Sequence, residues 1–441
     1  MNIIFKEDLM KKIKSPVTWG LIIVILFMSY IGVKSETDKR KMGAYAYGER
    51  SLYETSGEVL FGEFDEETKE SWDRRTHDIL IEVHNRLVKY YKKDSPNFSK
   101  ASAFSSIISA NLMVGPNNPN PFLNKMLKEK SLEIWDEVSD GINYEDVNFT
   151  RTGAKYPLEQ LLIHTLHAKV QYYFYKNNIN LFIDTYSNIE FTYRFLITVL
   201  PILIIIVGII INYNNINKEV KEGSAKLVLT QSIQRWKYYL GKYFSGVITV
   251  LFIILVPMII VNIAMGIKDG FQSLNYPILY DKQGLTRFFP SFNYIEKANE
   301  LFGERLAGIS NVPRMPISKE TFVTQRNINI IPYYQYILLT LGFIILFVLF
   351  LVAFVQLFSS LINNQILSIA VSIGLYGGMY LWGQRYLVER NYNVNPFTMN
   401  NSARIVAGTQ NATMLTVAIV LILSTIILLA IGLRYFKKKS I

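Results

Sequence analysis

Uncharged apolar runs alternate with polar segments along the chain, and six of these runs are long enough for a membrane-spanning helix. Each run is apolar all round, whereas a strand of a membrane β-barrel changes polarity at every second residue. A helix needs about 20 apolar residues to cross a hydrocarbon core about 30 Å thick, and flanking Tyr, Trp and Thr residues lie at the interfaces. The pattern therefore predicts an all-α polytopic membrane protein with six transmembrane helices, at residues 17–33, 191–211, 244–267, 334–358, 366–382 and 412–433.

The polar segments between these helices differ in length and pattern. Residues 34–190 are long enough for an extracytoplasmic domain with its own core, and their apolar residues recur at three- and four-residue spacing, which favours a mostly helical fold. At 1–16, apolar residues interleaved with lysines predict a helix that lies in the membrane interface. The other segments are an outer loop at 268–333, a short cytoplasmic turn at 359–365, an outer loop at 383–411 and a basic tail at 434–441.

Lysine and arginine residues near the helix ends set the expected orientation. They concentrate before the first helix, in the central segment (residues 212–243) and after the last helix, and positive residues stay preferentially in the cytoplasm. Six helices place these three segments on one face, so we expect a multi-pass protein of the plasma membrane with both termini cytoplasmic. The net charge of +11 does not indicate a nucleic-acid partner, because residues 34–190 hold 20 Lys and Arg against 24 Asp and Glu. The basic excess instead follows the topology and suits anionic lipid.

Catalytic and cofactor motifs are missing from the sequence of 441 residues. There is no cysteine, and Gly241-Lys242 lacks the first glycine and the hydroxyl residue of a phosphate-binding loop. We therefore expect that the chain is not an enzyme, does not hydrolyse ATP by itself and binds no cofactor. Four histidines would bind a metal only if their two predicted helices met, and surface or half-buried positions are commoner for such residues: His77, His84, His164 and His167.

The interiors of the predicted spans contain no charged residue and no histidine. This argues against a proton- or sodium-coupled transporter, because such charges usually mark an ion path. Milder polar residues such as Asn262, Gln356 and Ser368 are expected to hydrogen-bond between helices. The sequence thus describes a membrane conduit without an energy source of its own.

The central segment is the one substantial feature on the expected cytoplasmic face. Leu227, Val228 and Leu229 predict a short helix there, with Gly223 before it and Ser224 as its N-cap. A helix that lies across this face and is attached to two spans can transmit a rigid-body push from a partner. The central segment is therefore the candidate receiver of force.

Two groups of residues resemble motifs of the type-2 ABC exporter permeases. The first group lies within the central segment and consists of Glu222-Gly223-Ser224, a leucine-rich turn to Thr230, Ser232-Ile233-Gln234-Arg235 and Gly241-Lys242. The second lies in the last outer loop: Asn395-Pro396-Phe397, Arg404 and Gly408. Within this pattern, Ser224 replaces the family's usual Thr, and Gln231 occupies a region where Pro is common.

The resemblance implies a half-transporter that pairs with a second copy or a paralogue. Two separate cytoplasmic ABC ATPase subunits would bind ATP and Mg²⁺ and drive export along a path lined by the first, second and fifth helices. The residues that dock the ATPase would be Glu222, Gly223, Ser224, Leu227 and Arg235. An outer gate loop would contain Asn395, Pro396, Phe397 and Gly408.

Three interpretations follow for the cargo and the activity. Apolar walls without fixed charge favour the export of an amphipathic compound, either a peptide such as an antimicrobial peptide or a lipid-like molecule. The alternative is a membrane sensor or immunity protein whose extracellular domain binds a peptide without transporting it. A membrane-embedded enzyme is the third interpretation, and the sequence offers no catalytic cluster for it.

Overall fold

The computed structural model describes residues 2–39, 82, 85, 97, 99–104, 107, 133–143, 168–179, 186–230, 233–271, 273–288, 328–389, 394–407 and 412–438. The four histidines, Gln231 and Gly408 lie outside the described residues. The predicted metal alternative, the closing glycine of the outer loop and most of the predicted extracytoplasmic domain at 34–190 thus fall on residues that the structure does not describe.

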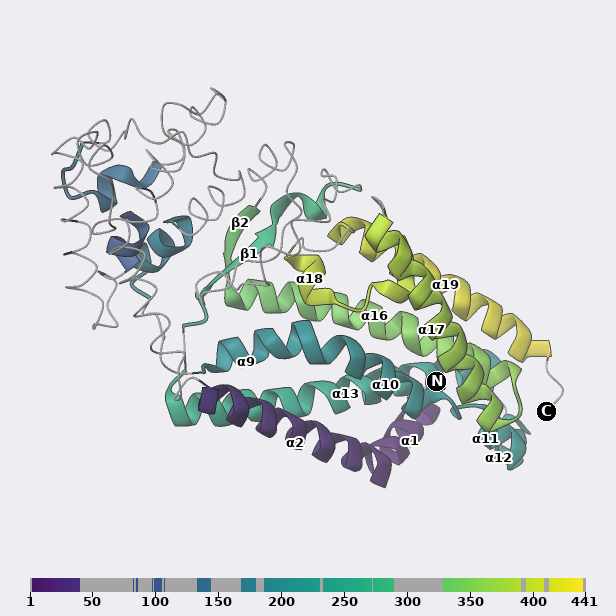
Figure 1. Ribbon diagram of the computed structural model, residues 1–441. Helices are drawn as coiled ribbons and strands as arrows, with labels where there is room; N and C mark the ends of the chain where they lie inside the picture. Colours follow the sequence, from purple (N-terminus) through teal and green to yellow (C-terminus); the bar gives the residue numbers. More distant parts are fainter. Residues whose placement is uncertain are drawn as a thin grey trace.

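Six helices of the described chain are long and apolar enough to cross a membrane, as predicted (Figure 1). The first is α2 (Pro16–Lys39), and the second is a composite of α9 (Asn188–Arg194), η3 (Phe195–Val199) and α10 (Leu200–Asn212). The others are α13 (Arg235–Asp269), α16 (Tyr333–Leu361), α17 (Gln365–Glu389) and α19 (Met414–Lys438). The all-α polytopic architecture is thus confirmed.

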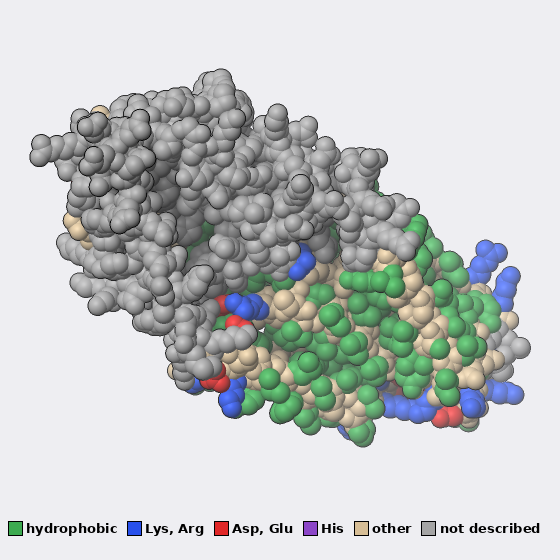
Figure 2. Space-filling model, viewed as in Figure 1, with side chains coloured by type: hydrophobic (Ala, Val, Ile, Leu, Met, Phe, Trp, Pro, Cys, Tyr) green, Lys and Arg blue, Asp and Glu red, His purple; other side chains and the backbone are tan. Residues whose placement is uncertain are grey.

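Helix α16 forms the centre of the helical bundle, since it packs against α10, α13, α17 and α19. Its Phe347, Leu351 and Val355 are fully buried, which is typical of a helix that is apolar all round. A Cβ atom at Gly208 of α10 would overlap Leu351, so glycine is required for the close approach of these two helices. Apolar side chains also cover the outer surface of the bundle, as expected for contact with lipid or another apolar partner (Figure 2).

The second span contains a π-helical turn, η3, just before Pro201. Pro201 has no backbone N–H, so it cannot donate to the carbonyl of Ile197 one turn earlier. Asn401, the N-cap of α18 (Ser402–Val406), supplies the missing donor: its Nδ2 donates to the Ile197 carbonyl at 2.9 Å. Asn400 donates in the same way to the Pro201 carbonyl at 3.1 Å. The irregular turn is therefore satisfied by the loop after η6 (Pro396–Thr398).

Two short strands that the sequence pattern did not predict lie within the expected outer loop at 268–333. Strand β1 (Pro277–Asp281) pairs antiparallel with β2 (Ile328–Pro332), with Pro277 opposite Pro332. At five residues each, the strands are too short for alternation to stand out. The turn η4 (Lys282–Leu285) follows β1, and Tyr333 N donates to the Tyr276 carbonyl at 2.8 Å, which attaches the sheet to the start of α16.

Helices α1 (Asn2–Ile13), α11 (Asn217–Lys221) and α12 (Ser224–Thr230) lie with the end of α19 at one end of the bundle (Figure 1). We call this the basal end. Lysine and arginine side chains gather there (Figure 2). The two terminal segments and the central segment thus share one face, which is the arrangement that an even number of spans requires.

Candidate functional site

The central segment begins with a sharp turn between α11 and α12. Gly223 has a φ of +76°, a left-handed conformation that strains any residue with a Cβ atom. Glu222 N donates to the Lys218 carbonyl at 2.9 Å and Gly223 N to the Val220 carbonyl at 3.3 Å, so Gly223 ends α11 as a C-terminal glycine. The same residue caps the start of α12, because its carbonyl accepts from Leu227 N at 3.3 Å.

The prediction that Ser224 is the N-cap of α12 is wrong. Ser224 is the first residue of α12, and its hydroxyl donates to the Glu219 carbonyl at 3.3 Å instead of accepting from α12. Gly223 occupies the capping position because only glycine tolerates the backbone turn there. The side chain of Ser224 therefore reinforces the end of α11.

One side of this turn is open to the surface and the other is buried. Four of the sequence-predicted docking residues are exposed together: Glu222, Gly223, Ser224 and Leu227. Leu227 is the most exposed apolar side chain of α12, at 68 %. On the opposite side Ala225 is fully buried, with Val228 and Leu229 packed beside it.

The buried side of α12 rests on a small apolar cluster that is separate from the main core. Aromatic side chains dominate it, and the ring of Tyr238 on α13 stacks on Phe436 of α19 with a centroid distance of 5.7 Å. Its buried members come from α1, the central segment, α13 and α19: Ile4, Ile216, Ala225, Tyr238, Tyr239 and Phe436. The cluster therefore connects α12 to three other helices.

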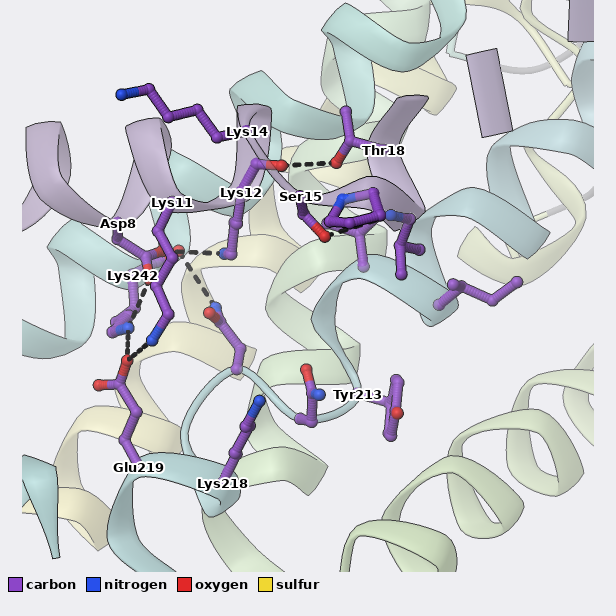
Figure 3. A pocket seen from close by; sticks show the side chains of 16 residues that line it. Asp8, Lys11, Lys12, Lys14, Ser15, Thr18, Tyr213, Lys218, Glu219 and Lys242 are labelled. Carbon is purple, nitrogen blue, oxygen red and sulfur yellow. Dashed lines mark hydrogen bonds and ion pairs between the residues drawn. The ribbon is translucent and has the colours of Figure 1, made fainter. Parts of the chain in front are cut away.

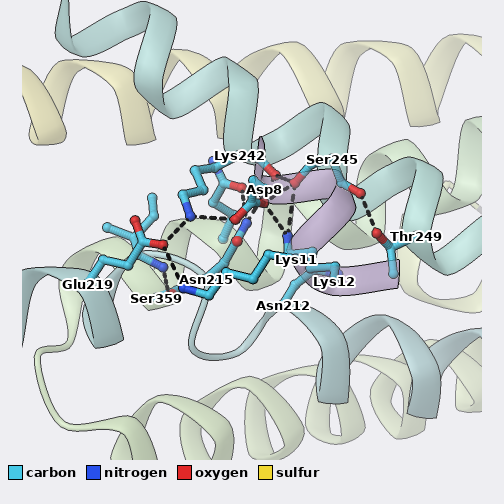
Figure 4. Close-up of polar contacts among 12 residues, drawn as sticks. Asp8, Lys11, Lys12, Asn212, Asn215, Glu219, Lys242, Ser245, Thr249 and Ser359 are labelled. Atoms are coloured by element: carbon cyan, nitrogen blue, oxygen red, sulfur yellow. Dashed lines mark hydrogen bonds and ion pairs between the residues drawn. The ribbon is translucent and has the colours of Figure 1, made fainter. Parts of the chain in front are cut away.

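A buried ion-pair network ties α1 and α11 to α13 (Figure 4). Lys242 has a 5 % exposed side chain, and its Nζ lies 2.5 Å from both Asp8 Oδ1 of α1 and Glu219 Oε1 of α11. Asp8 also pairs with Lys12 at 3.0 Å and accepts from the Ser245 hydroxyl. The charges of these two acids and two lysines cancel, as buried charges generally require.

The environment of this network shifts the pKa values of its members on α1. Burial by itself raises the pKa of Asp8, but the charges of Lys12 and Lys242 and the hydrogen bonds from Lys242 and Ser245 outweigh burial, so the pKa lies below its ordinary 3.8. Burial lowers the pKa of Lys12, and the neighbouring Asp8 offsets part of that effect. Asp8 is therefore ionised throughout the physiological pH range.

An uncharged hydrogen-bond chain fastens the central segment to α16. Asn215 Nδ2 donates to Gln356 Oε1 at 2.9 Å, and Gln356 Nε2 donates to the Tyr239 carbonyl at 2.9 Å. Ser359 Oγ accepts from the backbone N–H of Ile216 at 3.0 Å. The predicted interhelical role of Gln356 is confirmed, and so are those of Asn262 and Ser368, which donate to Thr192 and to the Tyr213 carbonyl.

Arg235 lies apart from the exposed turn, at the first position of α13. Its guanidinium donates to the Lys437 carbonyl at 2.9 Å, at the C-terminal end of α19. A cation is favourable at that end of a helix dipole. The structure thus gives Arg235 an internal contact, in addition to any contact with a partner that the sequence predicts.

The outer-loop residues anchor two helices at the other end of the bundle. Asn395 Oδ1 accepts from Phe397 N at 3.0 Å, while its Nδ2 donates to the Met379 carbonyl of α17 at 2.8 Å. The Phe397 ring meets the edges of Phe350 and Phe354 of α16, and its carbonyl accepts from the Tyr376 hydroxyl at 2.8 Å. Asn395, Pro396 and Phe397 therefore join α16 to α17.

Sequence reasoning missed the ion-pair network. Asp8 and Lys12 follow Ile4 at four-residue spacing, so the three side chains share one face of α1. This spacing was the available signal, because a carboxylate between an apolar residue and a lysine points to a paired buried charge. Its partner Lys242 lies on a distant helix and leaves no trace in the local pattern.

No group of three or more His, Asp or Glu side chains that could hold a metal occurs in the described part of the chain.

A family model described as ABC-2 family transporter protein matches residues 2–441. No curated protein and no solved structure shows a match to this chain. Permeases of this family are membrane subunits that work with ABC ATPase subunits, which agrees with the six membrane helices. The chain therefore belongs to the ABC-2 family of transporter proteins and is a membrane-spanning ABC permease.

Proposed function

We propose that this permease exports its substrate and that its basal end faces the cytoplasm, where the ATPase subunits push on the turn between α11 and α12. The concentration of lysine and arginine at this end supports the orientation. Glu222, Gly223, Ser224 and Leu227 form the outer surface of the turn and supply the contact.

The observation that carries this proposal is the double attachment under the exposed turn. The apolar cluster joins α12 to α1, α13 and α19, and the ion-pair network joins α11 to α1 and α13. A push on so short a segment moves membrane helices only when it is rigidly attached to them. ATP and Mg²⁺ are held by the partner subunits, and a second permease, identical or paralogous, completes the path.

An amphipathic substrate fits a cleft at the other end of the bundle. This cleft of about 300 Å³ lies between α2 and the α9–η3 part of the second span, with mostly apolar walls. Its charged lining residues are Arg194 and Glu36, which pair at 3.1 Å, and Arg194 also pairs with the buried Glu190 at 3.0 Å. A peptide or lipid-like molecule with one polar end matches these walls, and Asn395, Pro396 and Phe397 position the neighbouring helices as an outer gate.

The test is ATP turnover and outward transport by the permease reconstituted with its ATPase subunits. Leu227→Ala and Glu222→Ala should each lower permease-stimulated turnover several-fold and weaken co-purification of the ATPase. The matched control is Leu338→Ala on α16, since Leu338 is 65 % exposed and Leu227 is 68 % exposed. Unchanged turnover in both docking variants would refute the docking surface. ATPase binding without any outward transport would favour the sensor.

A further inference from the structure

A second cavity, of about 510 Å³, lies at the basal end beside the ion-pair network (Figure 3). It is bounded by α1, the start of α2, the basal end of α10 and α11. Five lysines line it against only two carboxylates, Asp8 and Glu219: Lys11, Lys12, Lys14, Lys218 and Lys242. The cavity therefore carries a net positive charge and favours an anion.

Two of these lysines are not used by the network. Lys12 and Lys242 pair with Asp8 and Glu219, and Lys11 lies 3.7 Å from Glu219. Lys14 and Lys218 are exposed, and neither side chain has an ion pair or hydrogen bond to another of the described residues. Lys218 points from α11 into the cavity, so its ammonium group is available to a ligand there, whereas Lys14 lies at the rim, after the end of α1, and its side chain extends away from the other lining side chains.

A further part of the cavity wall is apolar and comes from the candidate membrane helices. Val17 lies at the start of α2, and Ile210 and Ile211 lie in the last turn of α10. This places the cavity where lipid head groups meet acyl chains, and its two walls match the two parts of a phospholipid. The start of α2 also lines it, and the N-terminal end of a helix dipole favours a phosphate.

A third feature points to the type of head group. Asn215 lines the cavity and is 5 % exposed, and its Oδ1 has no hydrogen-bond partner among the described residues. An unpaired buried oxygen is costly unless a donor reaches it. The hydroxyl of a glycerol head group is such a donor, whereas a choline head group has none.

We propose that this cavity binds an anionic glycerophospholipid of the adjacent leaflet. Its phosphate lies beside Lys218 inside the cavity, Lys14 adds positive charge at the rim, a head-group hydroxyl donates to Asn215, and its acyl chains run along Val17 and Ile210. The bound lipid links α2 to α11 and so supports the central segment from the membrane side. This inference requires only a membrane permease and does not depend on export or on the ATPase contact.

The experiment measures lipid binding to the full-length permease in nanodiscs of phosphatidylcholine with added phosphatidylglycerol, followed by native mass spectrometry of the retained lipids. The test variant is the double substitution Lys14→Gln with Lys218→Gln. A matched control, Lys6→Gln with Lys226→Gln, removes the same charge from two exposed lysines of the basal end that do not line the cavity. Inorganic phosphate at about 10 mM, well above a typical micromolar Kd, serves as the competitor.

We expect phosphatidylglycerol to be retained in preference to phosphatidylcholine by the unmodified permease and by the control. The test variant should bind it about 10- to 30-fold more weakly, as for two lysines near an anionic surface. Equal losses in both double variants would mean diffuse attraction and would overturn the site. Absence of a preference would overturn it too. Displacement by inorganic phosphate would identify a soluble phosphate as the occupant and refute the lipid.

Discussion

Replacing Lys242 by methionine tests the ion-pair network at the basal end. The substitution keeps the length of the stem and leaves Asp8 and Glu219, whose side chains are 5 % and 16 % exposed, without their shared cation. Removing one partner of a buried ion pair costs about 3–5 kcal/mol, because a buried charge is left uncompensated. We expect the attachment of α1 and α11 to α13 to weaken by about this amount, which is enough to release α1.

Cysteine cross-linking measures this attachment directly, since the chain contains no cysteine of its own. A Cβ atom at Gly241 would lie 3.3 Å from the Cβ atom of Ile4 on α1, close to the separation of about 3.8 Å in a disulfide. The pair Ile4→Cys with Gly241→Cys should therefore cross-link readily in the parent chain. Adding Lys242→Met should lower the yield strongly, whereas Lys237→Met on the same helix should not.

A double substitution separates lost charge balance from lost packing. Asp8→Asn together with Lys242→Met leaves Lys12 and Glu219, so the network is again neutral. The double variant should cross-link better than Lys242→Met alone, because neighbouring charges are not additive. The reasoning is refuted if Lys242→Met leaves the yield unchanged, or if the double variant is impaired by the sum of the two single effects.

Two further predictions concern the turn and the pH. Gly223→Ala should destabilise the turn between α11 and α12 by about 1–2 kcal/mol, because Gly223 has a φ of +76°. The substitution should also lower co-purification of the ATPase. The control is Gly20→Ala, because Gly20 has open space around it and no left-handed backbone conformation. The pKa of Asp8 is depressed, so its contribution is complete above the pKa of the unfolded group and is lost as the pH falls through the lower folded value. The difference in Tm between the parent and Asp8→Asn should therefore stay constant from about pH 8 to about pH 5 and shrink below about pH 4; a difference that shrinks near pH 6 would contradict the depressed pKa.

The features that the sequence predicted well are those determined locally. A membrane helix follows from the length of its apolar run, so all six were found. The turn at Gly223 follows from the one residue type that tolerates it. Gln356 had to bond to a neighbouring helix because an amide in an apolar span has no water to satisfy it.

The features that it missed depend on distant partners. The π-helical turn η3 needs both Pro201, which frees the Ile197 carbonyl, and Asn401, which satisfies it. The strands β1 and β2 exist only as a pair of segments far apart in the chain. Asp8 and Lys242 are separated by 234 positions, and neither local pattern reveals the other.

The network and the lysine-lined cavity explain together why charges are retained where apolar residues would pack as well. A buried ion pair rarely adds net stability over well-packed apolar residues, so this network is better explained by the exchange of charged partners when α11 moves. If a push on α12 carries α11 and Glu219 outward, Asp8 remains paired with Lys12 and Lys242, while Lys242 and Lys11 both lose Glu219. Lys242 also lines the cavity proposed to hold an anionic lipid, so the negative head group lies in the same cavity as the lysine that loses Glu219. On this reasoning the anionic lipid lowers the cost of moving α11, so permease-stimulated ATP turnover should rise with phosphatidylglycerol content in the parent and not in the Lys14→Gln, Lys218→Gln variant. If ATP turnover rises equally in the parent and in this variant, the dependence on lipid does not arise from this cavity.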